Sequence, residues 1–365
     1  QLFSSTITVL NINLKQFIIS MKTFTILKKG ESIMKLALFN LREDERPFVD
    51  AWMKEHPDVE IDLHEGELQA ETKHLLDGKD GAVMFQNRPF AKEVYDYGKE
   101  QGLKVIANRM AGFDIYDIKY MRELGISMTN VPRYSPNAIA EHVVTTVLYI
   151  SRNIKKILNN IEKHNFTWNK NIISKELRTQ TVGVLGTGNI GRQTATLFKG
   201  LGCKVIGYDL YPSDAAREVL EYVDTIDELL SQADIVTIHV PATKEYRHMV
   251  NDEFFSKMKD GSIFANAARG ILVDTKAVIR ALDSGKLLGA SLDVYENEGN
   301  YVPKDFSNKD FDDKLMQELI DRDDIIYTPH TAFYTETAVK NLVEGALNAA
   351  VDVITTGDSP NIVNR

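Results

Sequence analysis

The chain has 365 residues, a net charge of −9 and a single cysteine, Cys203. This length allows two domains with cores of their own, while the acidic balance disfavours nucleic acid and anionic membranes as partners. A lone cysteine excludes an internal disulfide, and no apolar run is long enough to span a bilayer, so we expect a soluble cytoplasmic protein.

Residues 1–33 differ from the rest of the chain. They contain no acidic residue before Glu31 and show neither a helical nor an alternating period. The segment Lys28–Glu31 can be encoded by codons that contain a bacterial ribosome-binding sequence, and Met34 follows a few codons later. We therefore hypothesise that residues 1–33 are translated upstream DNA and that the natural protein begins at Met34. A targeting or docking tail is the alternative.

From Met34 onward, predicted strands alternate with helices. A long helix is expected from Pro136 to about His164, with Ser135 as its cap and apolar side chains at helical spacing. A last helix is expected over residues 336–355. The strands are predicted at Lys35–Asn40, Val59–Leu63, Gly81–Gln86, Lys104–Asn108, Ser127–Val131, Thr181–Leu185, Lys204–Asp209, Ile235–Val240, Ser262–Ala267, Gly289–Val294 and Ile325–Thr328.

This alternation predicts an α/β protein built on doubly wound parallel sheets. A single sheet holding every strand would be unusually large. We therefore expect two domains with a cleft between them. The pattern alone does not show to which domain the last helix belongs.

A glycine-rich turn follows one of these strands. Gly186, Gly188 and Gly191 form the pattern G-x-G-x-x-G between a predicted strand and the start of a helix. In dinucleotide-binding folds the first glycine makes the tight turn, the second lets the backbone approach the pyrophosphate, and the third lets the helix pack on the strand. The pyrophosphate binds at the helix N-terminus, where free N–H groups favour an anion. The turn alone is a weak signal, but its setting predicts a dinucleotide site.

Asp209 ends the next predicted strand, roughly 20 residues after the first glycine, where a carboxylate accepts hydrogen bonds from ribose hydroxyls. No arginine follows it, since the next residues are Leu210, Tyr211 and Pro212. A 2′-phosphate would therefore meet an unpaired carboxylate. The sequence favours NAD over NADP.

Three polar residues, Arg269, Glu298 and His330, follow later strands. Ligands in open parallel sheets bind beyond such strand ends. Reduction of a ketone builds negative charge on its oxygen, which a histidine can protonate near neutral pH, and a neighbouring carboxylate orients the imidazole. An arginine fork can hold a substrate carboxylate. Taken singly, each residue could instead belong to a surface ion pair, a Pro-His turn or a solvated acidic loop. No metal-site spacing is present, so no metal is expected.

From Met34 to near its end, the chain resembles the D-2-hydroxyacid dehydrogenase family, and the lactate-type bacterial members most of all. The resemblance rests on several motifs that occur in the family's order. They are Val131–His142, the glycine turn at Gly186, Ala268–Gly270 with Leu272–Asp274, Leu282–Lys286 running on to Glu298, and Pro329–Tyr334.

The resemblance implies reversible, NAD-linked reduction of a 2-keto acid, with pyruvate and D-lactate as the expected pair. Arg269 resembles the arginine that binds the substrate carboxylate, His330 the general acid/base, and Glu298, rather than Glu296, its partner. Further implied substrate contacts are Ala111, Gly112, Tyr134 and Phe333. Implied cofactor contacts are Gly186, Gly188, Asn189, Ile190, Gly191, Asp209, Val240, Pro241 and Asp293.

The resemblance also implies how the domains are arranged. Residues 34–133 and 333–365 would form a flavodoxin-like substrate domain, into which a Rossmann cofactor domain of residues 134–332 is inserted. The last helix would return to the first domain, and a homodimer or higher homo-oligomer would form through the cofactor domain.

The chain departs from the family pattern at several positions. Arg133 stands where a small or apolar residue is common, Met110–Phe113 replaces a frequent Asn-Val-Gly-Val, and Ala268 replaces a serine or threonine. A broader D-2-hydroxyacid dehydrogenase, acting on branched or aromatic 2-keto acids, therefore stays open. Phosphoglycerate and formate dehydrogenases are disfavoured by the His-Thr-Ala-Phe-Tyr motif and by Glu298. Outside enzymes, the alternative is an NAD-sensing corepressor.

Overall fold

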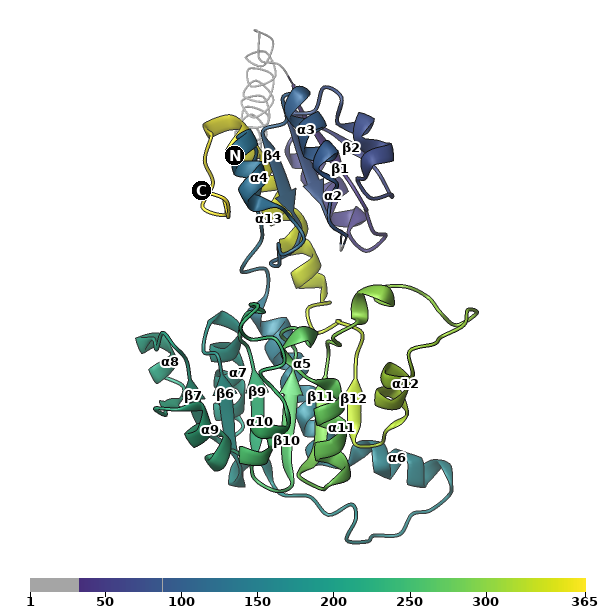
Figure 1. Ribbon diagram of the computed structural model, residues 1–365, viewed down its shortest axis with the longest axis vertical. Coiled ribbons are helices and arrows are strands. Elements are labelled where there is room, and N and C mark those ends of the chain that lie inside the picture. Colours follow the sequence, from purple (N-terminus) through teal and green to yellow (C-terminus); the bar gives the residue numbers. More distant parts are fainter. Residues whose placement is uncertain (1–32, 87) are drawn as a thin grey trace, which may run out of the picture. The chain divides into compact units, whose positions relative to one another are not determined.

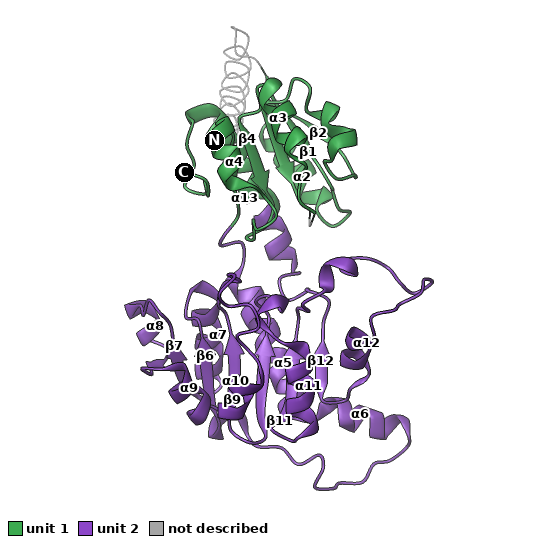
Figure 2. Cartoon of the chain, viewed as in Figure 1, with its two compact units in different colours: residues 1–131, 343–365 green, residues 132–342 purple. Residues whose placement is uncertain are grey.

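The computed structural model describes residues 33–86 and 88–365, so the hypothesis about the first 33 residues falls on residues outside this range, apart from the last of them. The chain divides into two compact units (Figures 1 and 2). Unit 1 contains the residues up to Val131 and Val343–Arg365, and unit 2 contains Pro132–Leu342. The last helix, α13 (Glu336–Thr356), runs across the second boundary.

Unit 1 is built on a five-stranded parallel sheet. Its strand order, β2-β1-β3-β4-β5, is the flavodoxin-like order. β3 and β4 are buried along their whole length, as expected for a parallel sheet covered by helices. The strands are β1 (Met34–Leu38), β2 (Val59–Leu63), β3 (Gly81–Met84), β4 (Val105–Asn108) and β5 (Ser127–Thr129).

Helices cover the sheet of unit 1. Tyr95 of α3 and Met121 of α4 pack in one core cluster with apolar strand residues. Outside that cluster α2 and α13 are joined by a hydrogen bond, in which Trp52 Nε1 donates to Asn348 Oδ1 over 2.8 Å. The elements are α2 (Arg46–Glu55), the 3₁₀ helix η1 (Ala70–Leu76), α3 (Lys92–Glu100), α4 (Ile118–Leu124) and the later part of α13.

Unit 2 is built on a seven-stranded parallel sheet, of order β12-β11-β10-β9-β6-β7-β8. If β6 is counted as the first strand, the six strands from β6 to β11 follow the Rossmann order 3-2-1-4-5-6, and β12 adds a seventh strand beside β11. The two sheets confirm the predicted fold class. The strands are β6 (Thr181–Leu185), β7 (Lys204–Tyr208), β8 (Glu221–Tyr222), β9 (Ile235–Ile238), β10 (Ser262–Asn266), β11 (Leu287–Leu292) and β12 (Ile325–Tyr327), of which only β8 was not predicted.

Two core clusters lie on the two faces of this sheet. One combines alternate strand residues with α5 and α7, and the other combines the remaining strand residues with α9, α10, α11 and α12. The sheet is therefore doubly wound. The helices are α5 (Pro136–Ser151), α6 (Ile154–Glu162), α7 (Asn189–Gly200), α8 (Asp214–Arg217), α9 (Ile226–Gln232), α10 (Asp252–Lys257), α11 (Thr275–Asp283) and α12 (Lys314–Asp321), with short 3₁₀ turns η2 (Leu177–Thr179), η3 (Gly270–Leu272) and η4 (Glu298–Asn300).

The prediction of one long helix after Pro136 is wrong. Ser135 caps the helix as expected, since its Oγ accepts the N–H of Ala138 over 3.4 Å, but the helix ends at Ser151 and a second one begins after Asn153. Asn153 adopts the left-handed conformation, with φ of 52°, which asparagine tolerates better than most residues. The apolar period continues through this break, so the sequence pattern did not reveal it.

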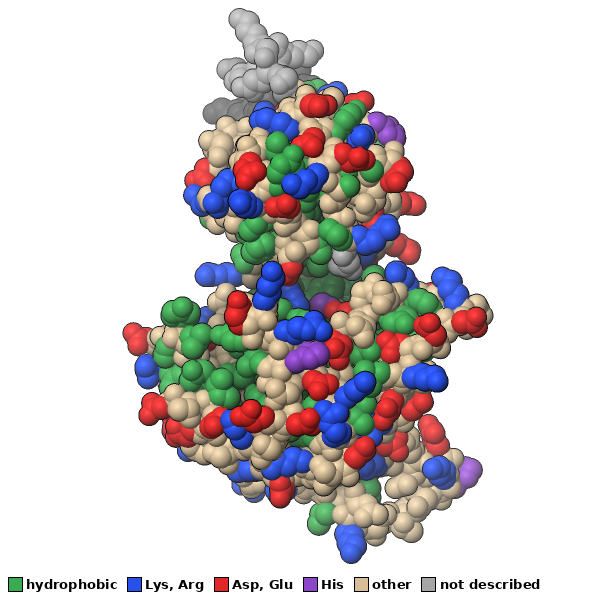
Figure 3. All heavy atoms as spheres, viewed as in Figure 1, with side chains coloured by type: hydrophobic (Ala, Val, Ile, Leu, Met, Phe, Trp, Pro, Cys, Tyr) green, Lys and Arg blue, Asp and Glu red, His purple; other side chains and the backbone are tan. Residues whose placement is uncertain are grey.

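The surface of the described residues carries mixed charge. Figure 3 shows acidic and basic side chains interspersed over the face in view. No helix in the described ranges is long and apolar enough to cross a membrane.

The one cysteine, Cys203, is buried, and burial raises the pKa of its thiol.

Candidate active site

Arg269, Glu298 and His330 follow three neighbouring strands of the seven-stranded sheet. β10 leads to the arginine, β11 to the glutamate and β12 to the histidine, and the strand order places these strands side by side. Because the strands are parallel, their carboxyl ends lie along one edge. The structure thus places the three predicted residues at the same edge of unit 2.

His330 and Glu298 are in direct contact. Nδ1 of His330 lies 2.7 Å from Oε1 of Glu298, and the two side chains are 34% and 20% exposed. The other carboxylate oxygen of Glu298 accepts the N–H of Tyr295 over 2.9 Å. With the carboxylate accepting from Nδ1, the proton of a neutral imidazole is held there, and Nε2 is left for another partner.

Asp293 holds the backbone on both sides of His330. This buried carboxylate accepts the hydroxyl of Thr328 over 2.6 Å and the N–H groups of Thr331 and Ala332 over 2.8 and 3.0 Å. The N–H of His330 donates to the main-chain carbonyl of Asp293 over 2.7 Å, and His330 itself has φ of 56°. These contacts stabilise a left-handed conformation that few residues other than glycine adopt. The cofactor contact of Asp293 stays a prediction.

The loop that bears Arg269 packs tightly against the loop after β11. A Cβ atom on Gly270 would lie 2.2 Å from the carbonyl carbon of Tyr295 and 2.6 Å from the nitrogen of Glu296. Only glycine fits there. Arg269 donates from Nη1 to the carbonyl of Ala268 over 2.8 Å, which uses one of its five donors. The close packing fixes the separation of the arginine loop and the glutamate loop.

Tyr134 and Phe333 form an aromatic wall beside His330. Their ring centroids are 6.3 Å apart and nearly perpendicular, and the ring of Phe333 lies 6.4 Å from that of His330. Burial raises the pKa of Tyr134 to about 12, against the opposing effect of the Arg269 cation. The phenol therefore remains protonated, and able to donate a hydrogen bond, throughout the neutral range.

Each glycine of the turn after β6 has its own structural reason. Gly186 has φ of 89°, and a Cβ there would lie 2.6 Å from the carbonyl oxygen of His239. A Cβ on Gly191 would lie 1.9 Å from the carbonyl oxygen of Gly186, so helix α7 can approach the strand only because this residue is glycine. Gly188 has nothing within 4 Å of its Cβ position. The backbone is therefore open at Gly188, immediately before the free N–H groups at the start of α7, and this arrangement fits a pyrophosphate.

Asp209 lies beside this turn. Its Oδ2 accepts the N–H and the hydroxyl of Thr187 over 2.6 and 3.1 Å, and its Oδ1 accepts the N–H of Tyr211 over 2.9 Å. The hydroxyl of Thr187 also contacts that of Tyr222 over 2.6 Å. The carboxylate is thereby oriented at the end of β7, where a ribose would be bound.

Val240 and Pro241 follow β9, the neighbour of β6 in the sheet. Cγ1 of Val240 would lie 3.0 Å from a Cβ on Gly186. The N–H of His239 donates to the carbonyl of Leu185 over 2.7 Å, and burial lowers the pKa of His239 to about 4. An apolar and neutral segment thus borders the glycine turn on this side.

The two remaining predicted substrate contacts, Ala111 and Gly112, belong to unit 1. They lie in the loop after β4, at the carboxyl edge of the five-stranded sheet. Asn130 and Asn108 donate from their side-chain amides to the carbonyls of Ala111 and Gly112, over 2.6 and 2.7 Å. Sequence reasoning gave no sign of these two asparagines.

Two further histidines, His142 and His248, lie close to the site. His142 Nε2 is 3.0 Å from the hydroxyl of Thr328 and 3.6 Å from Oδ1 of Asp293. His248 Nε2 is 2.9 Å from Oε2 of Glu296. In the sequence, His142 is marked only by its place at the end of the family motif Val131–His142, and His248 is not marked at all.

Comparisons with known proteins agree with this geometry. Residues 144–332 match the model of the D-isomer specific 2-hydroxyacid dehydrogenase NAD-binding domain. A D-lactate dehydrogenase of Treponema pallidum is 47% identical over 321 residues, which cover 88% of this chain and 97% of that protein.

Two solved structures are also similar. One is D-2-hydroxyisocaproate dehydrogenase, with a TM-score of 0.85, 37% identity and coverage of 91% of this chain and 100% of that one. The other is D-lactate dehydrogenase with NAD⁺ from Lactobacillus jensenii, with a TM-score of 0.83, 33% identity and the same coverage. The chain belongs to the NAD-dependent D-isomer specific 2-hydroxyacid dehydrogenase family.

Proposed function

We propose that the protein is an NAD-dependent D-lactate dehydrogenase, which reduces pyruvate reversibly to D-lactate. The observation that carries the proposal is the 2.7 Å contact between His330 and Glu298, at the edge of the sheet where Arg269 also lies. This set offers an acid, its orienting carboxylate and a carboxylate-binding cation, which are the groups that reduction of a 2-keto acid requires.

In this mechanism His330 is the general acid of pyruvate reduction. Glu298 accepts the hydrogen bond from Nδ1–H and orients the ring, so that the Nε2–H of the protonated imidazole can face the substrate carbonyl. The negative charge that builds on the carbonyl oxygen is neutralised by the Nε2 proton. In the reverse direction, neutral His330 takes the hydroxyl proton of D-lactate.

The other side chains bind and orient the substrate. Arg269 has a planar fork that can hold the carboxylate in two parallel hydrogen bonds. Tyr134 adds a neutral donor, and Phe333 excludes water from one side. In unit 1, the N–H groups of Ala111 and Gly112 would bind a carboxylate.

NAD would be held by the glycine turn, by Asn189 and Ile190 at the start of α7, and by Asp209 at the ribose. Val240 and Pro241 would line the adenosine side, and Asp293 would contribute near the reacting end. When bound, the reduced cofactor supplies the hydride that the substrate carbon accepts. We assign this role to residues 134–332, and the substrate role to residues 34–133 and 333–365. These bounds lie close to the division at Pro132 and Leu342.

Turnover and stereochemistry test the proposal directly. Purified protein should oxidise NADH in the presence of pyruvate, and chiral chromatography should find D-lactate. Formation of L-lactate would overturn the assignment. NADPH, assayed in parallel, should be a much poorer cofactor, because its 2′-phosphate would face the Asp209 carboxylate.

A broader substrate range is the second candidate. Arg133 is exposed next to Tyr134 in the chain, and the similarity to a 2-hydroxyisocaproate enzyme is as close in fold as that to lactate enzymes. Rates on pyruvate and 2-ketoisocaproate separate the two. A higher kcat/KM for 2-ketoisocaproate would move the assignment to the branched-chain acid.

We also propose that unit 2 forms a homodimer. α6 has no buried residue, and the segment after it exposes large apolar side chains, with Phe166 71%, Trp168 97% and Ile173 78% exposed. A second copy of the chain would cover this surface. Light scattering at micromolar concentration should give twice the chain mass, and a monomer would refute the dimer.

We place the enzyme in the cytoplasm, where the NAD pool is available, and cell fractionation tests that placement.

A further inference from the structure

The loop after β4 has its carbonyl groups held from within unit 1. Asn130 donates from Nδ2 to the carbonyl of Ala111 over 2.6 Å, and the N–H of Val131 donates to that of Met110 over 3.0 Å. Asn108 does the same for Gly112, over 2.7 Å. Three successive carbonyls of a surface loop are thus hydrogen-bonded, which leaves this loop little freedom to change its peptide orientations.

These carbonyls determine where the loop's N–H groups point. In a trans peptide the N–H is directed opposite to the C=O of the same unit. Holding the carbonyl of Met110 therefore directs the N–H of Ala111, and holding the carbonyl of Ala111 directs the N–H of Gly112. Within the described residues of unit 1, neither N–H has a hydrogen-bond partner. Two adjacent, oriented and unpaired donors suit an anion.

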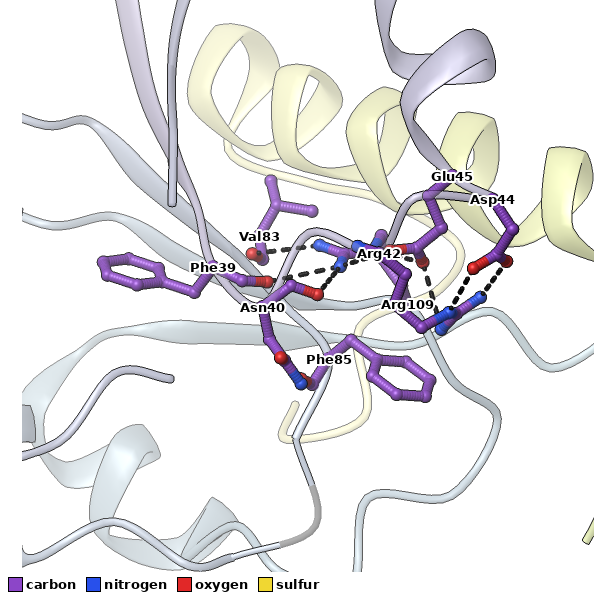
Figure 4. Close-up of polar contacts among 8 residues, drawn as sticks. All are labelled: Phe39, Asn40, Arg42, Asp44, Glu45, Val83, Phe85 and Arg109. Atoms are coloured by element: carbon purple, nitrogen blue, oxygen red, sulfur yellow. Dashed lines mark hydrogen bonds and ion pairs between the residues drawn. The ribbon is translucent and has the colours of Figure 1, made fainter. Parts of the chain in front are cut away.

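The residue before this loop is anchored still more firmly (Figure 4). Arg109 and Glu45 are both fully buried, and Nε and Nη2 of Arg109 each donate to a different oxygen of Glu45 over 3.0 Å. The same guanidinium donates to the carbonyls of Val83, Phe39 and Asn40 over 3.1–3.3 Å. It therefore joins the ends of β1, β3 and β4 to the start of α2, so the loop begins from a fixed point.

We propose that Asn130 is a positioning residue for substrate binding, assisted by Asn108 and by the Arg109–Glu45 pair. The Asn130 amide holds the peptide between Ala111 and Gly112 and so directs the N–H of Gly112 toward a substrate carboxylate, while the N–H of Val131 holds the preceding peptide and so directs the N–H of Ala111. Asn130 does not touch the substrate. The assignment rests on the proposed function, since it requires a 2-keto acid as ligand.

Replacement of Asn130 by Ala tests the assignment. The carbonyl of Ala111 then loses its partner, so the N–H of Gly112 is no longer held in direction and one charge-assisted hydrogen bond is lost. KM for pyruvate and Ki for its analogue oxamate should therefore both rise about 10- to 100-fold. The dissociation constant of NADH, and kcat at saturating pyruvate, should change little. A variant that is only less stable would lose active fraction, and thus kcat, without a parallel rise in KM and Ki.

Asn364 provides a matched control. It is a buried asparagine of the same unit, and its amide group donates to the carbonyl of Ile126 over 2.9 Å and accepts the N–H of Met128 over 2.8 Å. Asn364→Ala should lower the unfolding midpoint as Asn130→Ala does, while leaving KM and Ki unchanged. Equal KM values in both variants and the wild type would overturn the assignment.

Asn108→Ala is the second variant, for the case in which Asn130→Ala does not fold. It releases the next peptide of the loop, and the expected rise in KM is smaller, about 3- to 10-fold. Unchanged KM in a folded Asn108→Ala protein would refute the assignment in that case.

Turnover of the wild-type protein separates the positioning role from the proposed function, because absence of turnover on every 2-keto acid rejects the proposed function together with this role. Normal turnover with unaffected variants rejects the positioning role alone.

Discussion

The carboxyl edges of the two sheets differ in how they use charged side chains. In unit 1 the cation of Arg109 is fully buried, and its donors are directed to Glu45 and to three carbonyls. In unit 2 His330 is about one-third exposed, and only its Nδ1 is taken by Glu298. A charged side chain whose donors are all taken by the protein serves geometry, whereas a side chain with a nitrogen to spare can serve chemistry.

The largest effect on turnover should follow from removing the spare nitrogen. His330→Ala deletes the proton donor, and kcat should fall about 100- to 10,000-fold. NADH binding, measured by fluorescence titration, should remain nearly unchanged because the glycine turn and Asp209 are untouched. A loss of NADH affinity of similar size would show that His330 holds the fold of the cofactor site, and the contrast between the two edges would disappear.

How far the sequence predicts this site depends on how each residue is placed. The sequence places Arg269 and His330 at one edge because parallel strands end there, so position after a strand is itself a spatial signal. Asn130 and Asn108 were missed because their partners are loop carbonyls, which leave no trace in residue type or spacing. The break at Asn153 was missed because the apolar period continues past it, although α6 buries none of its residues.

The largest effect on stability should come from the buried pair of unit 1. Arg109→Met removes the cation that is buried with Glu45 and leaves that carboxylate paired with Arg42, 3.3 Å from Oε1, so the free energy of unfolding should fall by about 3 kcal/mol. Arg280 and Asp252 form an exposed control pair, with side chains 52% and 64% exposed. Arg280→Met should leave the urea midpoint nearly unchanged, because solvent screens an exposed ion pair. Urea unfolding measures both.

The double variant Arg109→Met with Glu45→Leu distinguishes a lost interaction from a stranded charge. It should recover part of the stability lost in Arg109→Met, because no charge is then left in the core. If the single variant were as stable as the wild type, the buried pair would have no structural role. The contrast between Arg109 in unit 1 and His330 in unit 2 would then not hold.

Arg269→Lys should have the next largest effect on activity. The substitution keeps the positive charge but replaces the fork by a point charge, so kcat/KM for pyruvate should fall about 100-fold. Arg133→Val is the control, since that arginine is exposed and precedes Tyr134. It should leave kcat/KM for pyruvate within a few-fold of wild type. Equal losses in both variants would mean that carboxylate binding rests on overall charge rather than on the fork.

The smallest effect should come from the second histidine–carboxylate pair of unit 2. His248 contacts Glu296 over 2.9 Å, and Oε1 of the same glutamate accepts the N–H of Thr275 at the start of α11 over 3.2 Å. Glu296 also lies where Gly270 packs against the loop. This pair resembles His330–Glu298 in composition, but it joins protein elements to one another, as the Arg109 contacts do in unit 1.

His248→Ala should therefore reduce kcat only about 5-fold, the equivalent of one net hydrogen bond. His248→Gln, which can still donate to Glu296, should recover most of that loss. The pH profile of kcat should keep its shape in both variants, because the proton donor is elsewhere. A loss as large as that of His330→Ala, or a displaced pH profile, would place His248 in the proton transfer. It would then follow that contact with a carboxylate that joins two protein loops does not exclude a chemical role for a histidine of unit 2.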